Sequence, residues 1–113
     1  MDFIPKITAV SYLNTIPFVY GLKHADNLRA ELSLAPPADC ARNYIEGRAD
    51  VALLPAAVVP SLKDTNIITD YCIGAVGPGR TVTVMSNHPI SAVKRIWLDP
   101  HSRTSVQLCG YLA

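Results

Sequence analysis

The chain has 113 residues; half are hydrophobic, 17% are charged, and the formal net charge is +1. This composition supports a buried core and argues against intrinsic disorder. It offers no cluster of lysine and arginine for nucleic acid or an anionic membrane. No apolar stretch approaches the roughly 20 residues of a membrane-spanning helix, and residues 1–10 lack the features of a secretory signal. We therefore expect a cytoplasmic protein with neither nucleic acid nor a membrane as a partner.

Strands and helices are predicted to alternate over the first 60 residues. Three short apolar runs have the pattern of strands, and each is followed by a segment with proline near its first turn. The predicted strands are 5–10, 30–35 and 50–55, and the helical segments are 15–22, 36–47 and 56–62. The last strand, DVALLP, is almost wholly apolar, which indicates that both of its faces are covered. This alternation predicts the α/β class, with a mostly parallel sheet flanked by helices.

The second half of the sequence predicts three further strands and one helix. The strands lie within NIITDYCIGAVG (66–77), TVTVMSN (81–87) and RIWLD (95–99), and the helix begins near Ser102. The glycine-rich segment GAVGPGRT fits neither a dinucleotide fingerprint nor a P-loop and is interpreted as a turn. Because the sequence ends within an apolar helix that follows a strand, we expect it to be the first lobe of a longer protein.

Cysteines and histidines give no sign of a metal site. The three cysteines, Cys40, Cys72 and Cys109, are far apart and odd in number, so we interpret them as buried, reduced thiols. The three histidines show no metal-ligand spacing. We therefore expect no bound metal.

Three segments are predicted to converge where the parallel strands end. They are SYLNT (11–15), LLPAA (53–57) and DPHSRTS (99–105), and each leads into a helical turn. A helix start offers unpaired N–H groups and a partial positive charge, so it can hold a carboxylate or phosphate without lysine. Ser102, Thr104 and Ser105 add hydroxyls, and Arg103 could add a charge. The alternative is that these Ser and Thr residues only cap their helix.

Four segments carry a resemblance to a known family. AVSYLNTIPFVYGL, EGRADVALLPAAV, IGAVGPGRTVTVMS and LDPHSRTSVQL together resemble the chorismate dehydratases of the futalosine route to menaquinone. A sister enzyme, the dihydroxynaphthoate synthase, carries Cys-Pro-Asn-Asp at the first corner, where this chain has Ser-Tyr-Leu-Asn. The family is similar to type 2 periplasmic binding proteins, with two α/β lobes about a cleft. The resemblance implies a first lobe over 1–98 and a crossover into a second lobe over 99–113, with the remainder beyond this sequence.

The resemblance also implies an activity. The family is a carbon–oxygen lyase that removes water from chorismate to give 3-[(1-carboxyvinyl)oxy]benzoate, without metal or organic cofactor, so the expected partner is this small dicarboxylate. Asn14 matches the family's loop asparagine, which hydrogen-bonds the reacting ring. The expected substrate-binding residues are Ser11 and Tyr12 at the same corner, Thr81 where the family usually has serine, Ser86, and Ser102, Arg103, Thr104 and Ser105 at the last helix start. The amides of Thr104 and Ser105 are expected to hold a carboxylate.

Two alternatives stay open. One is a non-catalytic protein of the same fold that binds small carboxylates. The other is a truncated, inactive lobe, which would bind chorismate weakly because one lobe buries only part of the ligand. The exposed apolar edge of such an isolated lobe would also invite self-association.

Overall fold

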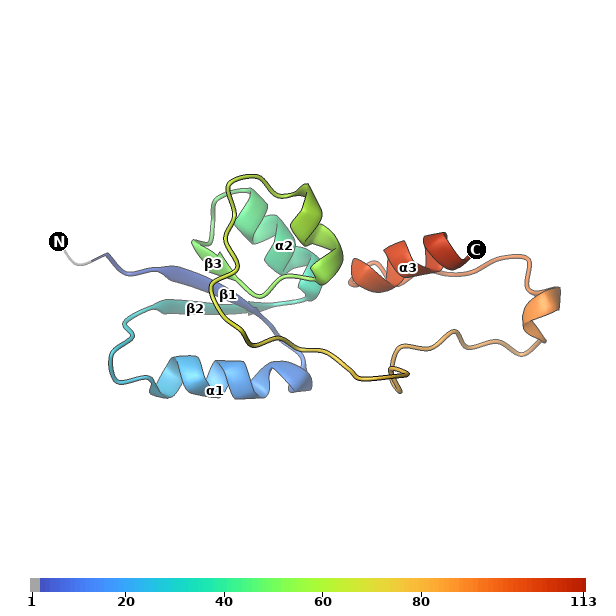
Figure 1. Ribbon diagram of the computed structural model, residues 1–113, viewed down its shortest axis with the longest axis horizontal. Coiled ribbons are helices and arrows are strands. Elements are labelled where there is room, and N and C mark those ends of the chain that lie inside the picture. Colours follow the sequence, from blue (N-terminus) through green and yellow to red (C-terminus); the bar gives the residue numbers. More distant parts are fainter. Residues whose placement is uncertain (1–2) are drawn as a thin grey trace.

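A parallel sheet of three strands organises the first half of the chain in this computed structural model, which describes residues 3–113 (Figure 1). The strands are β1 (Lys6–Val10), β2 (Glu31–Ala35) and β3 (Val51–Ala52), in the spatial order β2-β1-β3. Ile7, Thr8 and Ala9 of β1 are all buried, as expected of a central strand that is covered on both faces. The predicted α/β class and parallel sheet are confirmed.

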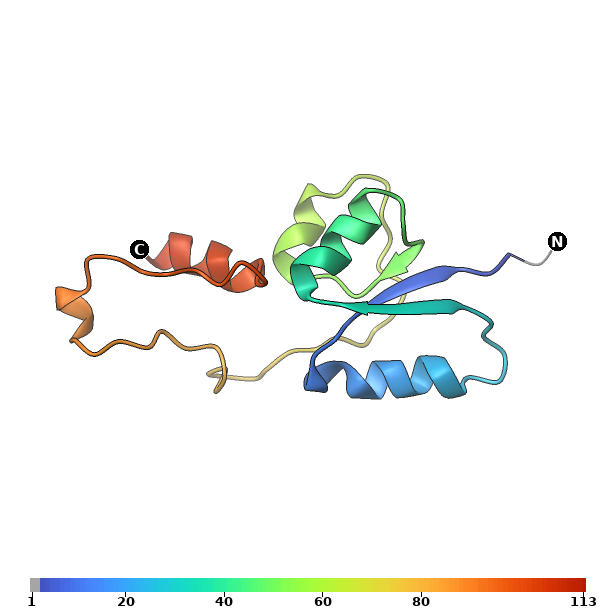
Figure 2. The ribbon, with the colours of Figure 1, turned by 180° about the vertical axis from the view of Figure 1, so that it is seen from behind.

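Three α-helices and three 3-10 helices accompany this sheet within residues 3–113. They are α1 (Ile16–His24), α2 (Pro37–Ile45) and α3 (Thr104–Leu112), with short 3-10 helices η1 (Leu13–Thr15), η2 (Ala56–Ser61) and η3 (Ile90–Ala92). Figures 1 and 2 show α1 on one side of the sheet and α2 with η2 on the other. Proline occupies the first turn of α1 and α2, where its missing N–H removes no helical bond. The helical segments predicted for the first half are confirmed, the third as a 3-10 helix.

Small side chains let α2 lie close to the sheet. Ala38, Cys40 and Ala41 are buried, and the Cys40 thiol lies between the helix and the strands. It accepts a hydrogen bond from the Thr8 hydroxyl at 3.5 Å and donates one to the carbonyl oxygen of Ala35 at 3.4 Å. Burial raises the pKa of the Cys40 thiol above its ordinary value, because the thiolate is poorly solvated there. Cys40 is therefore a packing residue rather than a nucleophile.

The other two cysteines differ from expectation. Cys72 is exposed and Cys109 is only partly buried, so the prediction of three buried thiols is correct for Cys40 and wrong for Cys72. The reason lies in the conformation of the chain around Cys72, where all neighbouring residues are also exposed.

Three predicted strands do not form. Residues 66–77, 81–87 and 95–99 contain no strand and are exposed almost throughout, so the strands predicted there are wrong. Their residues favour extended backbone, but a strand also needs a neighbour to complete its hydrogen bonds. The strand expected over 50–55 is present only as β3, which is half-buried.

A pair of glycine substitutions tests the local structure. Gly47 ends α2 with a φ of +70° and Gly21 lies within α1; a methyl group added at either would meet no atom within 4 Å. Gly47→Ala should lower the free energy of unfolding by about 1 kcal/mol, because left-handed backbone disfavours a Cβ. Gly21→Ala should raise it by roughly 0.5–1 kcal/mol, because alanine favours a helix interior. Urea unfolding of both variants measures these changes. If both substitutions changed the free energy of unfolding in the same direction, the left-handed backbone at Gly47 or the helical position of Gly21 would be contradicted.

Candidate functional site

The corner that follows β1, residues 11–15, is joined to the end of β2. The N–H of Ser11 donates to the carbonyl oxygen of Ala35 at 3.0 Å, and the side chain of Thr15 is fully buried. Asn14 is exposed, and its Oδ1 accepts a long hydrogen bond from the Thr15 hydroxyl at 3.5 Å. The buried threonine thus anchors the corner, while the carboxamide NH₂ of Asn14 has no hydrogen-bond partner among residues 3–113.

The segment that returns from the second half of the chain is bonded to the starts of α2 and η2. The N–H of Ala38, in the first turn of α2, donates to the carbonyl oxygen of His101 at 3.3 Å. The N–H of Ala57, at the start of η2, donates to Oγ1 of Thr104 at 3.4 Å. These bonds gather the starts of α2, η2 and α3 at the carboxyl edge of the sheet, the edge at which ligands of open α/β sheets bind.

The sequence analysis predicted the helix α2 but did not include its start in the site. The segments predicted to converge were those that begin after residues 10, 52 and 98, and the segment that follows β2 was not among them. The Pro36–Pro37 pair directly after that strand is nevertheless a signal for the start of a helix. Since α2 carries the amide that holds His101, this omitted segment positions the last segment of the site.

A tight turn and a serine cap build the start of α3. The carbonyl oxygen of Asp99 accepts a hydrogen bond from the N–H of Ser102 at 3.2 Å. Its Oδ1 accepts a second from the N–H of His101 at 2.9 Å. Asp and Pro are favoured in the first two positions of such a turn, and Pro100 follows Asp99. Oγ of Ser102 then accepts the N–H of Ser105 at 3.2 Å. Ser102 therefore acts as a cap, the alternative that the sequence had left open.

The cap leaves other amides of the first turn of α3 available. The N–H of Ser105 donates to Oγ of Ser102. It is therefore not free to bind a carboxylate, contrary to the expectation from the sequence. The N–H groups of Thr104 and Val106 have no hydrogen-bond partner among residues 3–113, and Arg103 beside them is exposed. Two unpaired amides, the helix dipole and a guanidinium form a group that can hold a carboxylate.

The predicted site residues fall into three places. Ser11, Tyr12 and Asn14 lie on the corner and are exposed; Ser102, Arg103, Thr104 and Ser105 form the start of α3; Thr81 and Ser86 lie in the extended segment between them in sequence. Within residues 3–113, no hydrogen bond joins Thr81 or Ser86 to either of the other groups. Ser86 instead accepts the N–H of His88 at 3.0 Å, a local turn. The structure thus attaches the corner and the helix start to the same edge of the sheet, through Ala35 for the corner and through Ala38 and Ala57 for the helix start, without Thr81 and Ser86.

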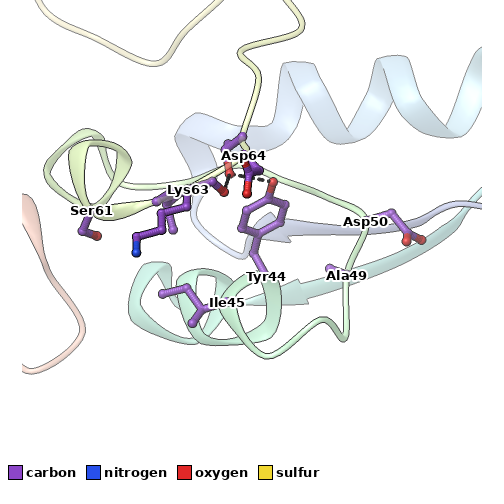
Figure 3. A pocket seen from close by; sticks show the side chains of 9 residues that line it. Tyr44, Ile45, Ala49, Asp50, Ser61, Lys63 and Asp64 are labelled. Carbon is purple, nitrogen blue, oxygen red and sulfur yellow. Dashed lines mark hydrogen bonds between the residues drawn. The ribbon is translucent and has the colours of Figure 1, made fainter.

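A shallow hollow lies at the opposite edge of the sheet (Figure 3). It has a volume of about 470 Å³ and is lined by Tyr44, Ile45, Ala49, Asp50 and residues 61–65. Its fixed polar contacts are the hydroxyl pair Tyr44–Thr65, at 3.1 Å, and Asp50, whose carboxylate accepts the N–H of Lys6 at 2.8 Å. Lys63 and Asp64 also line this hollow. The carboxyl edge is the stronger candidate, because the starts of α2, η2 and α3 are gathered there.

Two further features are absent from residues 3–113. This part of the chain contains no group of three or more His, Cys, Asp or Glu side chains arranged to hold a metal ion. None of its helices has the length and apolar character needed to cross a bilayer.

The Ser102 cap can be tested by substitution. Ser102→Ala removes the oxygen that accepts the Ser105 N–H and should destabilise α3 by about 1 kcal/mol, which corresponds to roughly fivefold faster amide exchange in that helix. Ser102→Asp retains an acceptor and should keep exchange near the wild-type rate. Hydrogen–deuterium exchange of 104–112 measures both; unchanged exchange in Ser102→Ala would contradict the cap.

Comparison with known proteins assigns the chain to a family. A family model described as "Menaquinone biosynthesis" matches residues 5–112. No curated protein and no solved structure gives a significant match. The matched range contains both the corner after β1 and the start of α3, and it spans nearly the whole sequence. The chain belongs to the menaquinone biosynthesis family.

Proposed function

We propose that this member of the menaquinone biosynthesis family is a chorismate dehydratase, which forms 3-[(1-carboxyvinyl)oxy]benzoate and water. The observation that carries the proposal is that the Ser-Tyr-Leu-Asn corner and the start of α3 are attached to the same edge of the sheet. Ser11 is bonded to Ala35, and the last segment is bonded to Ala38 and Ala57. The family match supports it, because both segments lie within the matched range. The parallel sheet is compatible with one lobe of the two-lobed fold that the resemblance implies.

The two groups at this edge suit the two parts of the substrate. Chorismate carries two carboxylates, and the free amides of Thr104 and Val106, with Arg103, would hold one of them. The ring would then lie toward the corner. Ser11 and Tyr12 would contact it there through hydroxyl groups that are exposed in this structure.

Asn14 would act on the reacting ring. Dehydration breaks one ring C–O bond and one ring C–H bond, and the electrons that remain complete an aromatic ring. The driving force therefore comes from the substrate, and the protein supplies position and charge stabilisation. A carboxamide is too weakly basic to take the proton. Asn14 would instead donate a hydrogen bond from its NH₂ group and orient the carboxylate that accepts the proton.

A non-catalytic carboxylate-binding protein is the second candidate. It is favoured by the composition of the corner, because residues 10–25 contain no Asp or Glu that could act as a general base. The same edge would then bind a small carboxylate and release it unchanged.

Turnover separates these functions and tests Asn14. The protein is incubated with chorismate, and the aromatic product is followed by absorbance and mass spectrometry. Asn14→Ala should lower kcat by roughly a hundredfold, as loss of a hydrogen bond made in the transition state does, and change KM much less. Asn27→Ala is the matched control, because Asn27 is an exposed asparagine before β2, at the opposite edge.

The outcomes are distinct. Full activity in Asn14→Ala would remove Asn14 from the mechanism. Binding of chorismate by calorimetry without any product would support the carboxylate-binding protein. The absence of both chorismate binding and product would contradict a chorismate site on this chain.

A further inference from the structure

Two polar side chains within residues 3–113, those of Thr8 and Thr15, are fully shielded from solvent. A buried hydroxyl has to find its hydrogen-bond partner inside the protein, because water does not reach it. The Thr8 hydroxyl bonds to Cys40 at 3.5 Å and belongs to the packing of α2 against the sheet. Thr15 directly follows Asn14, the residue that we assign to the reacting ring. The partner of its hydroxyl therefore bears on the site.

The Thr15 hydroxyl does not have the role that its position suggests. Threonine at the start of a helix usually caps it by accepting a backbone N–H of the first turn. Thr15 directly precedes α1, but its side chain makes no capping hydrogen bond. Its backbone, at φ −88° and ψ −12°, is helical rather than extended, unlike that of a usual capping residue. Pro17, in the first turn of α1, also has no N–H to offer.

The hydrogen bond that this hydroxyl does make is directed at Asn14. Within the described part of the chain it donates only to Oδ1 of Asn14, at 3.5 Å. A bond of this length is weak, but a buried hydroxyl with one acceptor has no competing direction in which to turn. The backbone of Thr15 is itself fixed, because its N–H donates to the carbonyl oxygen of Tyr12 at 3.0 Å.

This bond determines which end of the Asn14 carboxamide is free. A carboxamide has an oxygen that accepts and an NH₂ group that donates, and its surroundings decide which of the two faces which way. Because the Thr15 hydroxyl occupies the oxygen, the NH₂ group is the end that remains for a substrate. The reversed orientation would present an acceptor to a substrate that already carries two carboxylates.

We propose that Thr15 is a positioning residue, which holds the Asn14 carboxamide with its oxygen inward and its NH₂ group toward the substrate. Being fully buried, Thr15 acts through Asn14 and does not touch the substrate. The inference rests on the proposed function, in which Asn14 donates a hydrogen bond to the reacting ring.

Removing the hydroxyl while keeping the shape of the side chain tests this role. Thr15→Val should lower kcat by roughly tenfold, because a misoriented donor is a misplaced catalytic group, and should leave KM nearly unchanged. Thr15→Ser keeps the hydroxyl and should keep kcat near the wild-type value. Thr8→Val is the matched control, because Thr8 is equally buried and its hydroxyl also makes a 3.5 Å bond. It should not change kcat.

A double substitution separates positioning from a general effect on stability. When Asn14→Ala has removed the carboxamide, adding Thr15→Val should lower kcat no further, because the two residues act as a unit. A wild-type kcat in Thr15→Val, an equal loss in Thr8→Val, or a second tenfold loss on top of Asn14→Ala would each overturn the proposal.

The conformation of Asn14 can also be measured without turnover. Three-bond NMR couplings from Cγ of Asn14 to its backbone nitrogen and carbonyl carbon report the χ1 rotamer. One rotamer should dominate in the wild type and in Thr15→Ser, and rotamers should average in Thr15→Val. If the wild type forms no product, the dehydratase proposal fails and these couplings still decide the role of Thr15. Averaging in the wild type, or a single rotamer retained in Thr15→Val, would refute it.

Discussion

The hydrogen bond from the Ala38 N–H to the carbonyl oxygen of His101 joins the two halves of this chain. The N–H groups of Asp39 and Cys40 are bonded to the carbonyl oxygen of Pro36, whereas the N–H of Ala38 takes its acceptor from outside the helix. The returning segment supplies one, and the bond between Ala57 and Thr104 adds a second attachment. The start of α3 thereby lies at the carboxyl edge of the sheet, so the anion-holding group of the proposed site depends on this attachment.

Local sequence signals predicted the first half of the fold well. Proline in the first turn of α1 and α2, and Gly47 after α2, are constraints that act within a few residues and need no distant partner. The second half was predicted poorly for the opposite reason. Runs such as TVTVMS favour extended backbone, but whether they form strands depends on a neighbouring edge, which a local pattern does not specify. The same limit hid the contact between α2 and His101.

The candidate site was likewise predicted where local signals define it and mispredicted where distant contacts do. The sequence indicated the Ser11–Thr15 corner and the start of α3, because each combines a strand exit with a helix start. In the structure both are attached to the same edge of the sheet. The sequence left open whether Ser102 caps the helix, which the bond to Ser105 resolves. Thr81 and Ser86 were expected nearby through resemblance and lie instead in the exposed segment between residues 66 and 98.

The location of the ligand is the most direct test of a site at the carboxyl edge. Hydrogen–deuterium exchange of the wild-type protein, with and without saturating chorismate, reports it independently of turnover. The account predicts slower exchange in two segments, 11–15 and 101–106, with the hollow at 61–65 unchanged. Slower exchange confined to 44–50 and 61–65, or bound chorismate with no change at the corner and at the start of α3, would contradict it.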